Sequence, residues 1–302
     1  MADAAPGLAP FDLNAWSQQQ LDRVEAALSR WVCSQAPAGL GDAMRYAVLD
    51  GGKRLRPLLV LAASDAVGGL GEAALRAACS VELIHAYSLV HDDMPCMDND
   101  VLRRGKPTVH VQFGEAQALL AGDALQALAF GLLTPEDGVP PALQALLCRL
   151  LARAAGADGM AGGQAIDLAS VGIALNEDQL RQMHRLKTGA LLQASVVMGA
   201  SCGTASAGAL AALSQYGAAL GLAFQVVDDI LDVTADSATL GKTAGKDAAS
   251  DKPTYVSLLG LEHARTYADE LLADAHAALG ASHLPDTRAL AALADMVVNR
   301  SH

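Results

Sequence analysis

The chain is short of charge, of aromatic side chains and of strand-forming residues. Of its 302 residues, 18% are charged and 4% are aromatic, and isoleucine occurs four times. No run of Val, Ile and Thr alternates over the length of a strand, whereas Ala and Leu, which favour helices, are abundant. These absences argue against a sheet, and we predict an all-α protein. The prediction is a single-domain bundle of about ten helices over residues 1–302.

Positive charge is scarcer than negative charge, with 21 Lys and Arg against 33 Asp and Glu and a net charge of −12. An acidic balance argues against a nucleic-acid partner. The five cysteines, Cys33, Cys79, Cys96, Cys148 and Cys202, are odd in number and widely spaced. This usage favours buried thiols in a reducing compartment over disulfides or a zinc site, and we expect a cytoplasmic protein.

Targeting and membrane signals are also lacking. The first residues, MADAAPGLAPFDLNAW, have no basic stretch followed by an apolar one, so we predict no signal peptide. Residues 189–227 carry no charge and are long enough to span a membrane. Three glutamines interrupt them, however, and the turn-like sequence SCGTASAG (Ser201 to Gly208) divides them. We therefore predict two buried helices and no membrane span.

Several helix boundaries can be predicted from local signals. Asn14 is expected to cap the first long helix, and a second long helix should run from Gly71 to the break at Pro95. Asn176 with Gln179 three residues later is a capping-box pattern. Pro57 suits the first position of a helix.

Carboxylates gather at two distant places in this otherwise apolar chain. In VVDDILD, Asp228 and Asp232 are four residues apart, so on a helix they share a face and lie about 6 Å apart along the axis, with Asp229 beside them. Such crowded carboxylates repel one another and are costly to bury. A solvated helix end is one interpretation, and a site for a hard cation such as Mg²⁺ is the other.

The second acidic sequence is LVHDDMPCMDND. Pro95 should end the helix there, which would leave Asp92 and Asp93 in its last turn and allow Asp98 to fold back toward them. His85 lies two turns before Asp92 on the same stripe. It is either an ordinary core histidine or a site residue that points the same way as the acids.

Basic residues adjoin both acidic sequences. They occur in GGKRLRP (Lys53, Arg54, Arg56), in LRRGKP (Arg103, Arg104, Lys106), at Lys187 followed by Thr188, and at Lys242, Lys246 and Lys252. Any one group could be a solvated face. Together, acids for cations, bases for phosphate and an apolar interior suggest a substrate with a diphosphate head and a hydrocarbon tail.

These sequences resemble the trans-isoprenyl diphosphate synthases, most closely the short-chain bacterial farnesyl diphosphate synthase type. The similarity covers nearly the whole chain and includes GGKRLRP, LIHAYSLVHDDMPCMDNDVLRRGKPTVH, AGDALQ, GMAGGQAIDL and FQVVDDILDVTADSATLGKTAGKD. The resemblance implies a homodimeric helical bundle with a central elongated pocket. It also implies a head-to-tail condensation of isopentenyl diphosphate with an allylic diphosphate, dimethylallyl or geranyl diphosphate.

The resemblance assigns roles to individual residues. Asp92, Asp93 and Asp98 on one wall and Asp228, Asp229 and Asp232 on the other would bind about three Mg²⁺, or Mn²⁺ as an alternative, that bridge the allylic diphosphate. Arg103, Lys187 and Lys242 would neutralise the leaving diphosphate, with Thr188 and Gln225 beside it. Isopentenyl diphosphate would bind Lys53, Arg56, His85 and Arg104, and Lys252 would be a further substrate contact. The released diphosphate would accept the last proton.

Chain length is implied by the residues before the first aspartate. Ser88 is expected about 6 Å below Asp92 on the same stripe, and the bulky Tyr87 is expected to stop growth at C15. Ordinary core packing remains an alternative for Tyr87. Products of C10 or C20 and a non-catalytic partner subunit also remain open. A terpene cyclase is disfavoured because the chain has only four Phe and two Trp to stabilise migrating cations.

Overall fold

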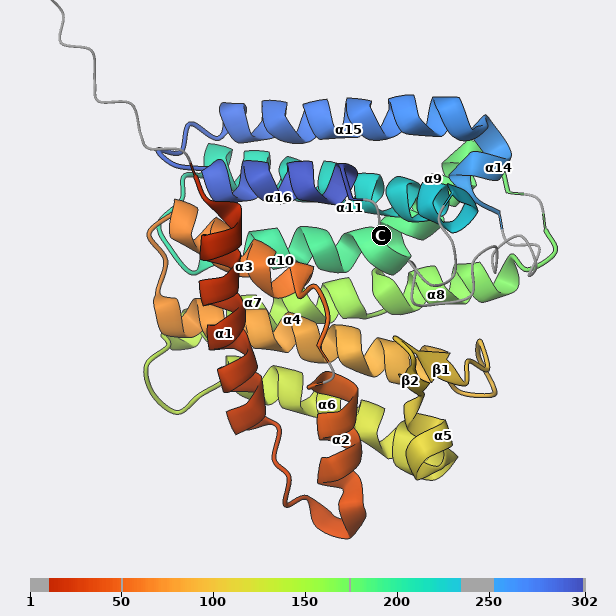
Figure 1. Ribbon diagram of the computed structural model, residues 1–302. Coiled ribbons are helices and arrows are strands. Elements are labelled where there is room, and N and C mark those ends of the chain that lie inside the picture. The colour runs from red at the N-terminus through yellow and green to blue at the C-terminus, as the bar shows by residue number, and fades with distance from the viewer. Residues whose placement is uncertain (1–10, 50, 174, 235–252, 301–302) are drawn as a thin grey trace, which may run out of the picture.

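The computed structural model describes residues 11–49, 51–173, 175–234 and 253–300 (Figure 1). Their regular structure is almost entirely helical, which confirms the predicted class. The α-helices are α1 (Leu13–Trp31), α2 (Leu40–Val48), α3 (Leu55–Ala66), α4 (Gly71–Asp92), α5 (Val109–Phe113), α6 (Glu115–Leu133), α7 (Pro141–Ala155), α8 (Met160–Ala169), α9 (Glu177–His184), α10 (Ala190–Ser201), α11 (Ala207–Thr234), α14 (Tyr255–Leu259), α15 (Leu261–Ala281) and α16 (Arg288–Val298). The described residues hold more helices than the predicted ten or so, because five-residue helices such as α5 and α14 are too short to give a periodic signal.

Two short strands and two short helical segments, η1 (Pro37–Gly39) and η2 (Arg185–Gly189), complete the described structure. β1 (Leu102–Arg103) and β2 (Lys106–Pro107) form an antiparallel hairpin, which pairs Leu102 with Pro107. A 3₁₀ turn precedes α2, and a π-helix, η2 (Arg185–Gly189), joins α9 to α10. A hairpin this small leaves no alternating pattern in the sequence, so its absence from the prediction follows from its length.

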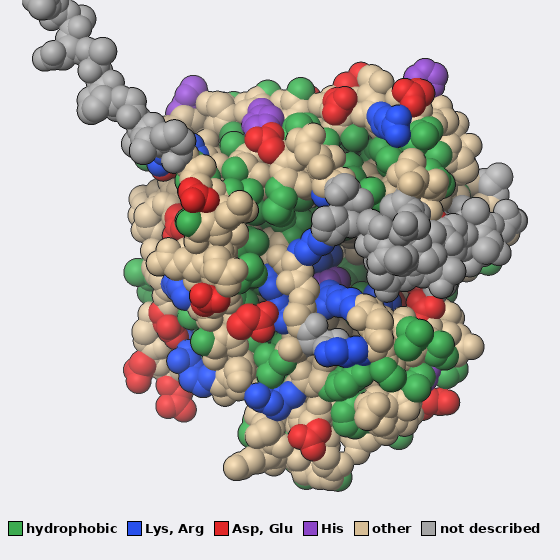
Figure 2. All heavy atoms as spheres, viewed as in Figure 1, with side chains coloured by type: hydrophobic (Ala, Val, Ile, Leu, Met, Phe, Trp, Pro, Cys, Tyr) green, Lys and Arg blue, Asp and Glu red, His purple; other side chains and the backbone are tan. Residues whose placement is uncertain are grey.

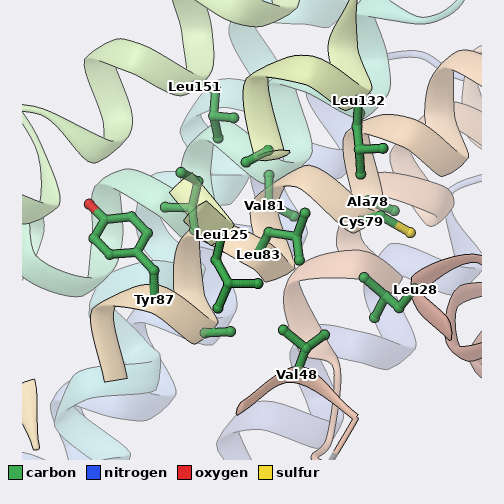
Figure 3. Close-up of a cluster of buried hydrophobic side chains, with 14 of the residues drawn as sticks. Leu28, Val48, Ala78, Cys79, Val81, Leu83, Tyr87, Leu125, Leu132 and Leu151 are labelled. Atoms are coloured by element: carbon green, nitrogen blue, oxygen red, sulfur yellow. The ribbon is translucent and has the colours of Figure 1, made fainter. Parts of the chain in front are cut away.

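The long helices pack as neighbours in the order α15, α11, α10, α4 and α6, and α3 lies against both α10 and α4. Figure 1 shows these helices running roughly side by side, with α1 crossing them on one face. α4 is buried along most of its length, because other helices pack against it on several sides. Figure 3 shows part of the core beside α4, including Leu83 and Leu125, with Tyr87 at its edge. α4 therefore runs through the middle of the bundle, and the first aspartates lie at its C-terminal end.

Helix ends confirm some local predictions and correct others. The capping box is present: Asn176 accepts from Gln179 N at 2.9 Å, and Gln179 Oε1 accepts from Asn176 N at 3.0 Å. The cap of α1 is Asp12 rather than Asn14, because α1 begins at Leu13 and the Asp12 side chain accepts from Ala15 N at 3.0 Å.

The start of α3 also differs from the prediction. Pro57 is the third helical residue rather than the first. The helix begins earlier because Arg54, with a φ of 48°, forms the cap. Its guanidinium is buried between Glu25, Glu82 and the carbonyl of Val48. These contacts hold Arg54 at the start of α3, two residues before the proline was expected to begin the helix.

The uncharged stretch 189–227 is divided between α10 and α11, as predicted, with the break between Ser201 and Ala207. By length and composition alone, three helices of the described chain could cross a membrane: α4, α6 and α11. α4 is the most buried of them within this bundle and α6 the least.

Candidate active site

The first aspartate cluster forms at the end of α4. Asp92 is the last helical residue and Asp93 is the cap. The following turn folds back, so that Asp98 N donates to the carbonyl of Asp92 at 2.9 Å and Asp100 N donates to that of Asp93 at 3.1 Å. The return of the chain after Pro95 agrees with the sequence prediction. Burial raises the pKa of Asp92 to about 6, Lys187 acts in the opposite direction, and Asp98 adds to the increase.

Asp93 and Arg103 form a pair that the sequence analysis did not anticipate. Arg103 Nε donates to both oxygens of Asp93, at 3.0 and 2.9 Å, and Nη2 donates to Oδ1 at 2.6 Å. The hairpin β1–β2 brings Arg103 to this position. Burial raises the pKa of Asp93, and the hydrogen bonds from Arg103 oppose the shift. Asp93 therefore has the guanidinium of Arg103 as a cationic partner.

The second aspartate cluster lies in the last turns of α11. Asp228 accepts from Arg300 Nη2 at 2.9 Å. Asp229 is buried and accepts from Gln225 Nε2 at 3.0 Å and from Tyr255 N at 2.8 Å. Asp232 is buried as well, and its Oδ1 has no hydrogen-bond partner in the described part of the chain. The three carboxylates thus have three different surroundings, and Asp232 is the least satisfied of them.

One cavity, of about 360 Å³, lies between the end of α4, helix α8 and the π-helix η2, and we call it the α4–α8 cavity. Tyr87, Ser88 and Asp92 line one side of it, and Lys187 and Thr188 line another. Methionine, alanine and leucine side chains make up much of the rest. It combines an apolar wall with a cationic and an anionic group, which suits a substrate with a charged head and a hydrocarbon tail.

The π-helix η2 places Lys187 and Thr188 on the wall of this cavity. A π-helix inserts one residue into the helical repeat and often marks a functional site. Thr188 Oγ1 donates to Gln225 Oε1 at 3.1 Å, and Gln225 in turn donates to Asp229. Thr188 and Gln225 are therefore neighbours, as the resemblance implies, and they connect this wall to the second aspartate cluster.

Tyr87 and Ser88 both line the α4–α8 cavity together with Asp92. Ser88 Oγ donates to the carbonyl of His85 at 2.8 Å. The ring of Tyr87 packs edge-on against His91, with 5.7 Å between centroids, and its hydroxyl is hydrogen-bonded to Gln126. Burial raises the pKa of Tyr87. Tyr87 is 8% exposed and belongs to the main hydrophobic core as well as to the cavity wall, so its expected role in chain length and ordinary core packing both fit its position.

A larger cavity of about 750 Å³ adjoins the first, and we call it the basic cavity. The four residues that the resemblance assigns to isopentenyl diphosphate line it: Lys53, Arg56, His85 and Arg104. Figure 2 shows Lys and Arg side chains gathered around the hollow in the middle of one face. Asp228 lines the same cavity. Because the two cavities share lining residues, they form the two ends of one extended pocket, in agreement with the expected elongated pocket.

Arg56 and His85 line both cavities. Burial lowers the pKa of His85 well below its usual value, and the nearby Arg56 acts in the same direction. The imidazole is consequently neutral at physiological pH and can donate one hydrogen bond without adding charge. Burial also lowers the pKa of Lys53, and Arg300 contributes to the decrease. Five cationic side chains line the basic cavity against two carboxylates, Glu82 and Asp228, and this excess of positive charge favours the binding of a phosphate.

Arg300 was not identified by the sequence analysis. It follows α16, and its Nη2 donates to the carbonyl of Phe224 and to Asp228, each at 2.9 Å. Its guanidinium also lies over the Phe224 ring, 4.0 Å from the centroid. The sequence does show a single arginine after an apolar helix, which could have marked Arg300 as a candidate. No local pattern, however, connects it to Asp228, which lies 72 positions away in the sequence. The predicted lysines 242 and 252 lie outside the described residues.

The carboxylates fit Mg²⁺ that binds together with a phosphate. Among the described residues, no three Asp, Glu, His or Cys side chains lie close enough to hold a metal ion by themselves. Mg²⁺ usually takes one or two carboxylates and completes its octahedron with water and substrate phosphate. The buried Asp92 and the unpartnered Oδ1 of Asp232 are both carboxylates that a cation would stabilise.

Comparison with known proteins agrees with this geometry. Residues 37–285 match the polyprenyl synthetase family. A probable farnesyl diphosphate synthase of Bradyrhizobium diazoefficiens is 52% identical over 87% of this chain and 81% of that protein. The chloroplastic geranylgeranyl pyrophosphate synthase 7 of Arabidopsis thaliana is 45% identical over 97% of this chain and 85% of that protein.

A solved structure has the same fold. The geranyltransferase of Helicobacter pylori, in complex with magnesium and isoprenyl diphosphate, is 35% identical and superimposes with a TM-score of 0.83 over 97% of this chain and 98% of that one. The paired aspartate clusters, the adjoining cavities and these similarities lead to one conclusion: the chain belongs to the polyprenyl synthetase family and is a prenyltransferase.

Proposed function

We propose that this enzyme condenses isopentenyl diphosphate head to tail with dimethylallyl and then geranyl diphosphate, which yields farnesyl diphosphate and diphosphate. The observation that carries the proposal is the pair of cavities that meet at Arg56 and His85. The α4–α8 cavity suits the allylic substrate, and the basic cavity suits isopentenyl diphosphate. The two reacting carbons would then meet at the boundary that these two residues line.

Mg²⁺, when bound, neutralises the charge of the allylic diphosphate and so makes it a better leaving group. We propose that the aspartates of both clusters hold it: Asp92, Asp93 and Asp98 on the α4 side and Asp228, Asp229 and Asp232 on the α11 side. Three of them, Asp93, Asp228 and Asp229, also accept hydrogen bonds from the protein, and they would share or exchange these partners when the ion binds. The number of ions, about three by family resemblance, remains part of the proposal.

Basic side chains divide between the two substrates. On the allylic side, Lys187 would bind the diphosphate, and Thr188 would turn its hydroxyl from Gln225 to a diphosphate oxygen. Arg103 would add positive charge while holding Asp93 in place. On the other side, Lys53, Arg56 and Arg104 would bind isopentenyl diphosphate. For Lys242 we still expect a contact with the leaving diphosphate, and for Lys252 a further substrate contact, both from the sequence alone.

His85 completes the isopentenyl diphosphate site. Because its imidazole is neutral, it can donate a hydrogen bond to a phosphate oxygen without taking up a proton. As the new bond forms, the proton that leaves the product goes to the released diphosphate, since a neutral His85 with a strongly lowered pKa is a poor base.

Product length is the least constrained part of the reaction. Tyr87 at the α4–α8 cavity supports a C15 product, whereas the similarity to a geranylgeranyl pyrophosphate synthase keeps a C20 product as the alternative. A C10 product would require release after one condensation. A non-catalytic subunit is disfavoured because all six aspartates of the two clusters are present.

The deciding experiment is mass spectrometry of the products formed from dimethylallyl and isopentenyl diphosphates, with Mg²⁺ and with a chelator. We expect a C15 diphosphate that disappears when the chelator is added. A longer or shorter product would support the condensation reaction but would contradict the assignment of Tyr87 as the residue that stops chain growth. Absence of any product in the presence of Mg²⁺ would favour a partner subunit.

We propose further that two copies of the chain associate and that each chain forms one synthase domain over residues 1–302. Leu119 and Leu120 on α6 are 47% and 51% exposed, and Val111 on the adjacent α5 is 49% exposed. An apolar surface of this kind favours a contact with another protein, here a second copy. All five cysteines are free, although Cys33 and Cys96 are exposed rather than buried as predicted. Free thiols support the proposed cytoplasmic location.

A further inference from the structure

Asp167 has a contact that neither the aspartate clusters nor the cavity linings explain. It lies near the end of α8 and is 5% exposed. Its Oδ2 accepts from Lys187 Nζ at 2.5 Å. Asp167 is absent from the residues that line the α4–α8 cavity, whereas Lys187 lines it. The carboxylate therefore contacts the ammonium of Lys187 without lining the cavity itself.

Lys187 lies between Asp167 and a cavity that contains a second carboxylate. Its Nζ contacts Asp167 Oδ2, and its side chain lines the α4–α8 cavity together with Asp92. A lysine side chain is long and flexible, so without the contact with Asp167 its ammonium could turn toward Asp92 across this cavity.

We propose that Asp167 is a positioning residue that holds Lys187 toward the allylic diphosphate and prevents it from pairing with Asp92. An ammonium has three donors, so one can remain on Asp167 while the other two face the cavity. Asp92 then stays available to a cation. This inference rests on the proposed function, because it assigns the role of Lys187 to the binding of an allylic diphosphate.

The backbone contact between α8 and η2 supports this role. A Cβ on Gly163 would come within 2.1 Å of Lys187 N, so α8 and the π-helix touch through their main chains. The carboxylate one turn further along α8 is therefore carried at a fixed position relative to Lys187. A lysine fixed at both its backbone and its ammonium loses little freedom when substrate binds.

A double-mutant cycle with Asp167→Asn and Lys187→Gln tests the proposal. For Asp167→Asn we expect the Mg²⁺ concentration for half-maximal rate and the KM for geranyl diphosphate to increase about tenfold each, because support residues behind a metal site typically change its affinity 10- to 100-fold. The KM for isopentenyl diphosphate should stay unchanged. In the Lys187→Gln background, Asp167→Asn should have no further effect.

The alternative is a purely structural ion pair. In that case Asp167→Asn would lower the melting temperature and the rate but leave the Mg²⁺ requirement unchanged, and its effect would persist in the Lys187→Gln background. Either result would overturn the proposal. Asp158→Asn, which changes an exposed carboxylate just before α8, is the matched control and should change nothing. Asp167→Glu should recover part of the lost affinity, since it keeps the charge.

Two further measurements keep the result interpretable. If Asp167→Asn does not fold, the double variant, which contains no unpaired buried charge, is expected to fold and can be compared with Lys187→Gln alone. Calorimetric titration of inorganic diphosphate with Mg²⁺ reports the same site without turnover. A wild-type protein that binds diphosphate but makes no prenyl product would contradict the proposed function and still leave the role of Asp167 measurable.

Discussion

Asp92 is partly buried and lies near two other carboxylates, Asp93 and Asp98. Burial raises its pKa to about 6, and Asp98 and Asp93 contribute to the increase. Its charged form is therefore costly in the metal-free enzyme at neutral pH, and a bound cation would relieve that cost. A functional residue of this kind destabilises the fold that carries it.

We predict that Asp92→Asn stabilises the metal-free protein against unfolding by on the order of 1–2 kcal/mol at about pH 7.5, after allowance for solvent screening. The pKa is higher in the folded state than in the unfolded state. The stability difference between variant and wild type should thus be complete above about pH 6 and vanish as the pH falls toward about 4. Urea unfolding with chelator over this range measures it.

The same substitution should nearly abolish turnover with Mg²⁺. Asp158→Asn, at an exposed site, should alter neither stability nor rate. A wild-type rate for Asp92→Asn would refute its assignment to the metal. A stability difference that grows toward acidic pH would refute the direction of its pKa shift.

Tyr87 is the residue from which the product length is inferred. We predict that Tyr87→Ala lengthens the main product by at least one C5 unit, because the cavity loses the ring that the His91 contact and the Gln126 hydrogen bond hold. Tyr87→Phe keeps the ring and should keep the product. Mass spectrometry of both variants provides the measurement, and an unchanged product from Tyr87→Ala would place the floor elsewhere.

At the scale of elements, the π-helix η2 is confined by two neighbouring helices. A Cβ on Gly163 of α8 would lie 2.5 Å from Lys187 Cα, and one on Gly221 of α11 would lie 2.8 Å from Gly189 Cα. Real side chains do not approach a backbone so closely. Both glycines are therefore needed for α8 and α11 to pack against η2, which carries Lys187 and Thr188 to the cavity.

We predict that Gly163→Ala displaces η2, which should destabilise the protein by about 1–3 kcal/mol and lower kcat/KM for geranyl diphosphate at least about tenfold. Gly131→Ala on α6 is the matched control, since a Cβ there meets no atom within 4 Å. It should leave activity unchanged and stabilise the helix slightly. Steady-state kinetics with thermal melting separate these outcomes, and an active Gly163→Ala enzyme would contradict the predicted displacement.

At the scale of the whole molecule, the least covered long apolar helix is α6. Leu120 is half-exposed there, in a helix with few charged residues. We predict that Leu120→Asp shifts the protein from a dimer to a monomer, as measured by light scattering after size exclusion. Leu258→Asp, at an exposed site on α14, is the control and should leave the assembly unchanged. If the wild-type protein is a monomer, or if the Leu120→Asp variant is still a dimer, α6 does not form the proposed dimer interface.

Much of the secondary structure of this protein could be predicted from local sequence signals. The helical class, the capping box at Asn176 and the break between α10 and α11 follow from propensity and from short-range hydrogen bonds. The return of Asp98 toward Asp92 could be predicted as well, since Pro95 must interrupt the helix. These features depend on residues a few positions apart, whose geometry the helix itself fixes.

Tertiary structure alone decided which charges meet. Arg54 is a buried partner of Glu82 rather than an open phosphate ligand, Arg300 reaches Asp228, and Lys187 meets Asp167. The sequence determined that acids, bases and apolar helices belong to one synthase site. It could not determine the pairs, because residues 20 to 72 positions apart meet only when helices pack at particular angles and depths.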